Sequence, residues 1–259
     1  VDETGRRVGG PVSAGGPGQS DRDPADRDPA EVAAERAAGQ PTDVWEVLSS
    51  ARAIRRFSDE PVSDEVIQRC LQAATWAPSG GNFQAWRFVI LRSPEVRAVV
   101  GKAAAMALDV IEGVYKMRRP EPHENDRKAR SDRATYEFHD RGGEFTSVLF
   151  ATENFPSASD LLLGGSIFPA MQNFLLAARA QGLGACPTSW ASYGGEPLLR
   201  EAVGMPDNWL LAGHVVVGWP RGRHGPVRRR PLSEVVYTDR WGDDVPTYKF
   251  KKEQASPGD

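Results

Sequence analysis

The stretch that decides the fold is Pro78-Ser79-Gly80-Gly81-Asn82-Phe83-Gln84-Ala85-Trp86. It lies between a helical pattern over residues 64–76 and an apolar run over residues 88–91 that is typical of a strand. Pro78 predicts the end of the helix, and the two glycines predict a bend that other residues avoid. A hydroxyl, two side-chain amides and an indole crowd around the glycines. They favour a loop that binds a flat, heteroatom-rich ligand over the alternative, an ordinary helix-to-strand turn.

The composition is that of a folded protein with little overall charge. The chain has 259 residues, 40% of them hydrophobic, which is enough for a full core in one large or two small domains. Residues 1–40 hold five basic and eight acidic side chains and account for the net charge of −3, so the remainder holds 27 of each sign. A neutral body has no global field to attract nucleic acid. We find no apolar run of the ~18 residues that a membrane helix needs, and no signal peptide. Neither nucleic acid nor a membrane is therefore expected as a partner.

Cysteine and histidine give no sign of a disulfide framework or a metal site. Cys70 and Cys186 are the only cysteines, which predicts a reducing, cytoplasmic setting. The four histidines show no ligand spacing, and His214 within the valine-rich run 209–218 is interpreted as a sheet-core residue. The sequence Gly182-Leu183-Gly184 lacks the third glycine of a dinucleotide-binding fingerprint. A separate nicotinamide-binding domain is not expected.

The two ends of the chain differ from its body. Residues 1–40 contain the tandem pentapeptide Asp-Arg-Asp-Pro-Ala at 21–25 and 26–30 and have little apolar surface, which predicts a disordered or extended arm with a short helix over about 31–38 at most. Residues 41–259 are predicted to form one domain. Its C-terminal extension, residues 237–259, is expected to wrap a neighbour.

Two basic clusters are candidates for binding a phosphate. Asp43 predicts the start of a helix that runs into the first cluster, where Arg52 and Arg55 would share one face. Arg56 is expected to point elsewhere. Residues 228–230, three consecutive arginines, form the second cluster in a predicted loop. For both clusters the alternative is a solvated basic surface.

The rest of the domain alternates helical and strand patterns. Helices are predicted from 64 to 76 behind a capping Ser63, from 94 to about 119, from 164 to 178 and from 197 to 203; strands are predicted at 185–190 and 209–218. Residues 120–157 carry five aromatic and many charged side chains without a clear period. A connection of this length is usually a functional lid or disordered, and we interpret it as a lid.

The loop at 78–86 resembles the P-S-x-x-N-x-Q-P-W signature of the nitroreductase family, with Ala85 in place of the family's proline. Residues 52–57 resemble the family's R-S-x-R-x-F phosphate motif, with Ala53 in place of serine. Residues 172–178 and 182–184 resemble its Q-N-x-L-L-A-A and G-L-G segments. The resemblance covers about residues 43–236.

The resemblance implies an α/β (α+β) fold, a mixed central sheet flanked by helices, in an intertwined homodimer with two FMN sites at its interface. The FMN-binding residues that it implies are Arg52, Ala53, Arg55, Pro78, Ser79, Gly80, Asn82, Gln84, Pro187, Thr188, Ser189, Arg228 and Arg230. A backbone N–H or hydroxyl of Thr188 or Ser189 would face flavin N5.

The implied activity is ping-pong oxidation of NADH or NADPH with reduction of nitroaromatic, quinone or similar planar acceptors. In the family the most variable segment sets acceptor choice, a role that we assign to residues 120–157. Two alternatives stay open. One is a flavin-sequestering or storage protein, and the other is a flavin destructase or dehalogenase on the same scaffold.

Overall fold

The computed structural model describes residues 40–41, 43–222 and 225–243, and the fold lies in the unit Pro41–Asp259. The predicted N-terminal arm, apart from Gln40, and residues 244–259 of the C-terminal extension lie outside the described residues. The described helices and strands are α2 (Val44–Ser50), α3 (Asp64–Thr75), β1 (Trp86–Leu91), α4 (Pro94–Tyr115), α5 (Arg127–Asp140), β2 (Thr146–Glu153), α6 (Asp160–Ala180), β3 (Gly184–Thr188), α7 (Glu196–Ala202) and β4 (Trp209–Gly218). Single helical turns cover Gly80–Asn82, Ala191–Gly195 and Leu232–Glu234.

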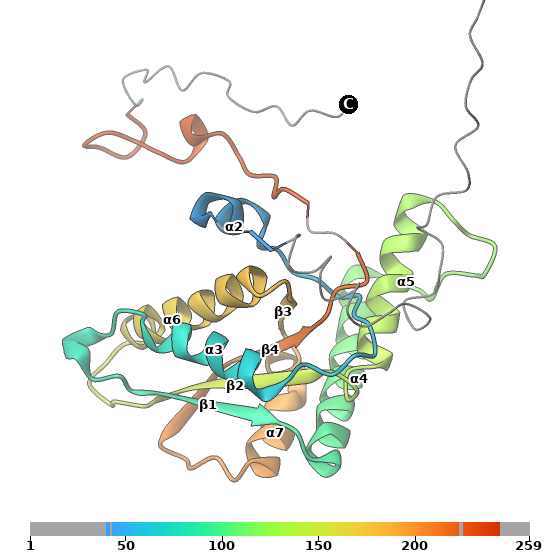
Figure 1. Cartoon of the computed structure of the whole chain (residues 1–259), viewed down its shortest axis with the longest axis horizontal. Helices are drawn as coiled ribbons and strands as arrows, with labels where there is room; N and C mark the ends of the chain where they lie inside the picture. Colours follow the sequence, from blue (N-terminus) through green and yellow to red (C-terminus); the bar gives the residue numbers. More distant parts are fainter. Residues whose placement is uncertain (1–39, 42, 223–224, 244–259) are drawn as a thin grey trace, which may run out of the picture. The chain divides into compact units, whose positions relative to one another are not determined.

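A four-stranded sheet forms the centre of the unit, in the order β1-β2-β4-β3 (Figure 1). All three pairs of neighbouring strands are antiparallel. One isolated parallel bridge, between Ala53 and Ala185, adds a short extended segment beside β3. The predicted α/β class, a central sheet flanked by helices, is confirmed.

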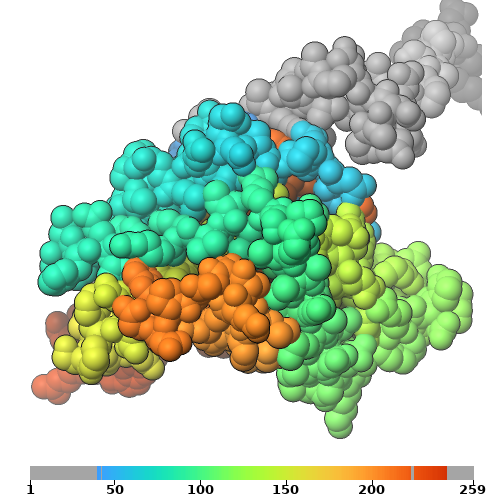
Figure 2. Space-filling view, turned by 90° about the horizontal axis from the view of Figure 1, so that it is seen from below, coloured from blue at the N-terminus to red at the C-terminus, as the bar shows by residue number. Residues whose placement is uncertain are grey.

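Helices cover both faces of this sheet. On one face α3 and α6 pack against Val215 and Val217, and on the other α4, α5 and α7 pack against Val216. Figure 2 shows the molecule from the side of this second layer, where α4 (green) and α7 (orange) lie side by side. Because successive side chains of a strand point to opposite faces, three consecutive valines supply both cores. The predicted strand at 209–218 therefore has the expected bounds and lies in the interior.

The segment after α2 is extended and not helical. Asp43 caps the helix as predicted, by accepting a hydrogen bond from the Trp45 N–H at 2.6 Å. The helix ends at Ser50, and the Ile54 N–H then donates to the Ala185 carbonyl at 3.0 Å. The prediction that a helix carries the arginines at 52 and 55 on one face was wrong, because β3 binds this backbone instead.

Residues 120–157 contain regular structure, contrary to their interpretation as a lid. They form α5 and the second strand of the sheet, β2, whose six inner residues are buried. Of the five aromatic side chains, Tyr136, Phe138, Phe145 and Phe150 are buried in the core. Only Phe155 lies near the signature loop, with its ring centroid 6.3 Å from that of Phe83.

Helix α6 departs from the expectation that no apolar run reaches the length of a membrane helix. By length and composition alone it could cross a membrane, with a mean hydropathy of 1.5 over its most apolar window. Within this unit it packs on α3 and on one face of the sheet through Ile167, Ala170, Phe174 and Ala178. Two further side chains, Leu161 and Phe168, are 88% and 50% exposed. This helix therefore has one packed side and one uncovered apolar side.

Candidate functional site

The predicted binding segments lie at the two edges of the sheet. The signature loop, residues 78–85, leads directly into β1 at one edge. Residues 52–57 run beside β3 at the other edge, and residues 187–189 form the end of β3 and the turn after it. With neighbouring strands about 4.8 Å apart, the two edge strands are about 14 Å apart. The chain thus presents two half-sites.

The two basic clusters come together at the β3 edge. Residues 219–222 and 225–227 run alongside residues 49–58: the Trp219 carbonyl accepts from the Ser58 N–H at 2.8 Å, and the Val227 N–H donates to the Ser49 carbonyl at 2.8 Å. A Cβ built on Gly225 would lie 3.8 Å from Nη1 of Arg52. The arginines at 228–230 follow at once and are exposed. Segments far apart in the sequence therefore form one basic surface.

The arginines of this surface differ in whether their charge is balanced. Arg56 lies 3.8 Å from Glu137, and Arg221 lies 2.8 Å from the same carboxylate. Neither the Arg52 nor the Arg55 side chain forms an ion pair or hydrogen bond with another described residue.

Arg228 and Arg230 have no described acidic partner either. Four guanidinium groups without a described acidic partner on one surface suit a phosphate, which accepts several charge-assisted hydrogen bonds. Ala53 lies between the first two of these arginines and contributes backbone alone.

The signature loop holds an unusual backbone. Asn82 and Gln84 have φ of 56° and 52°, in the left-handed region that residues other than glycine rarely adopt. The Ser79 hydroxyl accepts from the Gln84 N–H at 3.1 Å, and the Gln84 amide donates to Oδ1 of Asn82 at 3.2 Å. Strained residues held by their own side chains are frequent at ligand sites. The bend begins at Pro78, which is exposed.

The loop is tied to α6 by a residue that the sequence interpretation gave no polar role. The Gly80 N–H donates to the Ser166 hydroxyl at 3.3 Å. Ser166 stands in a group of small residues at 164–166, and small side chains allow a helix to approach a neighbour closely. The spacing of these small residues indicates that the helix can approach a neighbour closely. It does not indicate that the signature loop is that neighbour.

At the end of β3 one side-chain hydroxyl has a hydrogen-bond partner, and one backbone N–H has none among the described residues. The Thr188 hydroxyl is hydrogen-bonded to Nδ1 of the His214 ring at 2.8 Å. Burial lowers the pKa of His214 to about 3, so the ring is neutral, and its Nε2 has no partner among the described residues. The Ser189 N–H, in a half-buried turn, donates to no described acceptor. Pro187 on this edge strand is exposed and has no N–H to leave unpaired.

The described part of the chain contains no group of three or more His, Cys, Asp or Glu side chains that could hold a metal ion. The interpretation of His214 as a buried sheet residue is confirmed, because it is 1% exposed and lies opposite Thr188 in the β3–β4 ladder.

Comparison with known proteins identifies the family. The family model described as "Nitroreductase family" matches residues 48–219. A 5,6-dimethylbenzimidazole synthase of Rhodospirillum rubrum is 31% identical over 182 residues, covering 67% of this chain and 80% of that protein. An NADH dehydrogenase of Thermus thermophilus is 27% identical over 202 residues, covering 71% and 90%. The solved structure of an FMN- and NADPH-dependent nitroreductase, NfnB with the substitution Y88F, from sphigopyxis sp. strain HMH, superposes with a TM-score of 0.58 at 22% identity, covering 77% of this chain and all of that chain.

Proposed function

The chain belongs to the nitroreductase family of flavoprotein oxidoreductases, and on that premise we propose that it is an FMN-dependent oxidoreductase. Its electron donor would be NADH or NADPH, and its acceptors nitroaromatics, quinones or similar planar compounds, reduced by ping-pong turnover. The observation that carries the proposal is the basic surface at the β3 edge, where arginines from two distant segments have no described acidic partner.

The residues present suit FMN. Arg52, Arg55 and one of the arginines at 228–230 would hold its phosphate, because charge-assisted hydrogen bonds to phosphate are the strongest contacts that such side chains make. When bound, FMN supplies the hydride chemistry, so the protein needs no acid–base pair of its own.

At the reacting edge of the flavin we assign the donor role to a backbone group. The Thr188 hydroxyl is already engaged with the neutral ring of His214. The Ser189 N–H has no described acceptor, and a fixed backbone donor costs no reorganisation when charge develops in front of it. A backbone N–H or a hydroxyl of Thr188 or Ser189 is expected to face flavin N5. Of these groups, we select the backbone N–H of Ser189.

We further propose that each site is completed by a second copy of the chain. The signature loop and the arginine surface lie at opposite edges of the sheet, so two chains could contribute one half-site each to one flavin. Exposed apolar side chains occur beside both half-sites: Trp45 on α2 is 75% exposed and Leu161 on α6 is 88% exposed. Exposed apolar surface of this kind marks interaction sites.

A second candidate function is favoured by one comparison. The relative with 31% identity is a 5,6-dimethylbenzimidazole synthase, which is not a reductase of nitroaromatics by name. The same FMN-binding residues would serve such a reaction, so the site alone does not separate the two candidates.

Steady-state turnover separates them. The purified protein, loaded with FMN, is mixed with NADH or NADPH and a quinone, and oxidation of the nicotinamide is followed by absorbance. The proposal predicts repeated turnover with parallel lines in a double-reciprocal plot. Absence of turnover with the quinone, together with release of 5,6-dimethylbenzimidazole on incubation with FMN, NADH or NADPH and oxygen, would favour the second candidate. Absence of both would favour a protein that stores flavin.

A further inference from the structure

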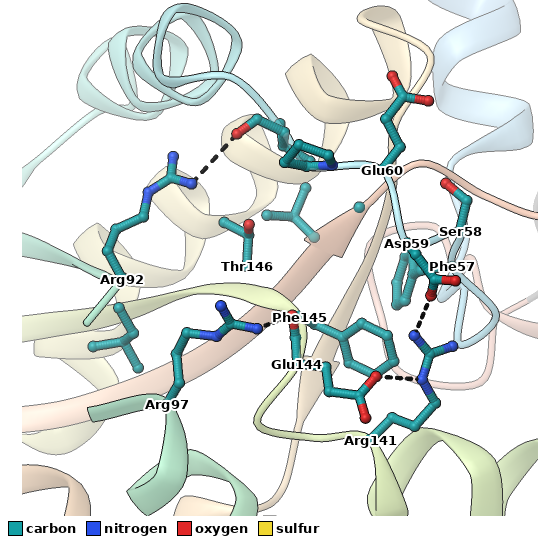
Figure 3. Close-up of a pocket in the computed structure, with 15 residues that line it drawn as sticks. Phe57, Ser58, Asp59, Glu60, Arg92, Arg97, Arg141, Glu144, Phe145 and Thr146 are labelled. Atoms are coloured by element: carbon teal, nitrogen blue, oxygen red, sulfur yellow. Dashed lines mark hydrogen bonds and ion pairs between the residues drawn. The ribbon is translucent and has the colours of Figure 1, made fainter. Parts of the chain in front are cut away.

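A cavity of about 350 Å³ lies at the end of the sheet away from the signature loop (Figure 3). Its lining includes Leu91 at the end of β1, Thr146 at the start of β2 and Val217 near the end of β4. The signature loop precedes β1 and therefore lies at the other end of this antiparallel sheet, whereas Thr188, opposite His214, ends β3 about halfway along β4. Across the six residues of β1 the two ends are about 17 Å apart. The lining begins at Phe57 and includes none of residues 52–55, 78–86 and 187–189, so the cavity is distinct from the candidate flavin site.

One wall of the cavity carries a positive charge that no described carboxylate balances. Arg97, in the first turn of α4, is half-buried, and Figure 3 shows its guanidinium pointing toward the middle of the cavity. Its Nε donates to the Gly143 carbonyl at 2.8 Å and its Nη2 to the Glu144 carbonyl at 2.5 Å. These backbone acceptors fix the guanidinium in place without neutralising it, and N–H groups on Nη1 are left for a ligand.

The other two arginines of the lining are already paired. Arg92 forms an ion pair with Asp64, and Arg141 forms ion pairs with Asp59 and Glu144. Their charges are balanced within the protein. Among the three arginines of the lining, Arg97 is thus the one without a described carboxylate partner.

Two hydroxyl groups of the lining also lack partners. The Ser58 hydroxyl is buried without a hydrogen-bond partner among the described residues, and the half-buried Thr146 hydroxyl has none either. A buried polar group without a partner is costly, so each such group points to a ligand or water that would satisfy it. The apolar part of the lining consists of Phe57, Pro61, Val62, Leu91, Phe145 and Val217.

We propose that this cavity binds a small organic monocarboxylate with an apolar body. One uncompensated guanidinium matches a single negative charge, and a carboxylate has a second oxygen to accept from the Thr146 hydroxyl. Asp59, Glu60 and Glu144 also line the cavity and would repel a dianion such as a phosphate monoester about twice as strongly as a monoanion. The apolar walls exclude a purely hydrophilic anion, because such an ion would lose hydration without gaining contacts.

Calorimetric titration of the full chain tests the charge requirement. Phenylacetate is the probe, phenylacetamide is its neutral counterpart of nearly the same shape, and phenyl phosphate is the dianionic counterpart. Saturable binding of phenylacetate is expected, with the amide weaker by about tenfold or more. Equal binding of the amide, tighter binding of phenyl phosphate, or no saturable binding of phenylacetate would overturn the proposal.

Variants locate the binding. Arg97→Gln should weaken phenylacetate about ten- to a hundredfold, and the isosteric Thr146→Val, which keeps the strand residue's shape, about fivefold. Arg118→Gln is the matched control, since that arginine is paired with Glu124 and lies beyond the far end of α4. Unchanged binding in Thr146→Val overturns the proposal even if Arg97→Gln fails to fold. Loss of binding in Arg52→Ala/Arg55→Ala would assign the probe to the flavin site and also overturn it.

Discussion

The double substitution Arg52→Ala/Arg55→Ala should weaken FMN binding strongly while leaving the fold almost unchanged in stability. Both side chains are exposed, and neither pairs with a described acidic residue, so their removal orphans no carboxylate. Substitutions of this kind usually change the free energy of unfolding by less than about 0.5 kcal/mol. A charge-assisted hydrogen bond contributes about 1.5–3 kcal/mol, which is about a ten- to hundredfold change in Kd for each arginine.

Arg56→Ala supplies a matched control from the same segment. That arginine is 63% exposed and is already in an ion pair with Glu137 at 3.8 Å. Exposed ion pairs contribute at most about 1 kcal/mol to stability, and the charge of this guanidinium is already offset in part by Glu137. Its removal should change the Kd for FMN by about twofold or less.

The assay is a titration of flavin-depleted protein with FMN, followed by flavin fluorescence, with a thermal unfolding curve for each variant. The reasoning is refuted if the double variant binds FMN with the wild-type Kd while folded. It is equally refuted if Arg56→Ala loses as much affinity as the double variant, because the distinction between balanced and unbalanced arginines would then have no effect.

Three further predictions concern assembly, burial and pH. Sedimentation should give a dimer for the wild type and a smaller species for Leu161→Glu, since that residue is 88% exposed on the uncovered side of α6; a wild-type monomer that holds FMN would contradict the shared site. Phe150→Ala should lower the free energy of unfolding by about 3–5 kcal/mol, because its ring is fully buried, whereas Phe155→Ala should cost far less; equal effects in urea unfolding would contradict the placement of β2 in the core. Burial lowers the pKa of His214 from its ordinary 6.5 to about 3, so the unfolded chain binds more protons and stability should fall as the pH drops below about 6.5. The substitution His214→Asn should therefore flatten the dependence of Tm on pH between about 7 and about 5. An unchanged slope would show that this ring does not cause the pH dependence.

Local signals predicted the elements whose neighbours in sequence decide their structure. Asp43 caps α2, and the helix before Pro78 ends at Thr75, as turn and cap chemistry required. The strand at 209–218 followed from its β-branched residues. The resemblance in the signature loop then predicted the family, and the family model confirms it.

The structural features that the sequence did not predict depend on contacts between residues far apart in the chain. The segment at Arg52 is extended because its neighbour Ile54 bonds to Ala185, and no local pattern could indicate that partner. Strand β2 showed no alternation because both of its faces are covered, so its inner residues are all buried. The closeness of Arg52 to Gly225 is likewise a product of the tertiary fold.

The most direct test of the central claim is the visible absorption spectrum of the purified full chain after incubation with FMN and removal of unbound flavin. The account predicts the spectrum of a bound oxidised flavin. Denaturation should release about one FMN per chain, or two per dimer, because the two-fold symmetry of a homodimer makes its shared sites identical. A colourless, folded protein that retains no FMN would contradict the claim that the arginine surface and the signature loop form a flavin site.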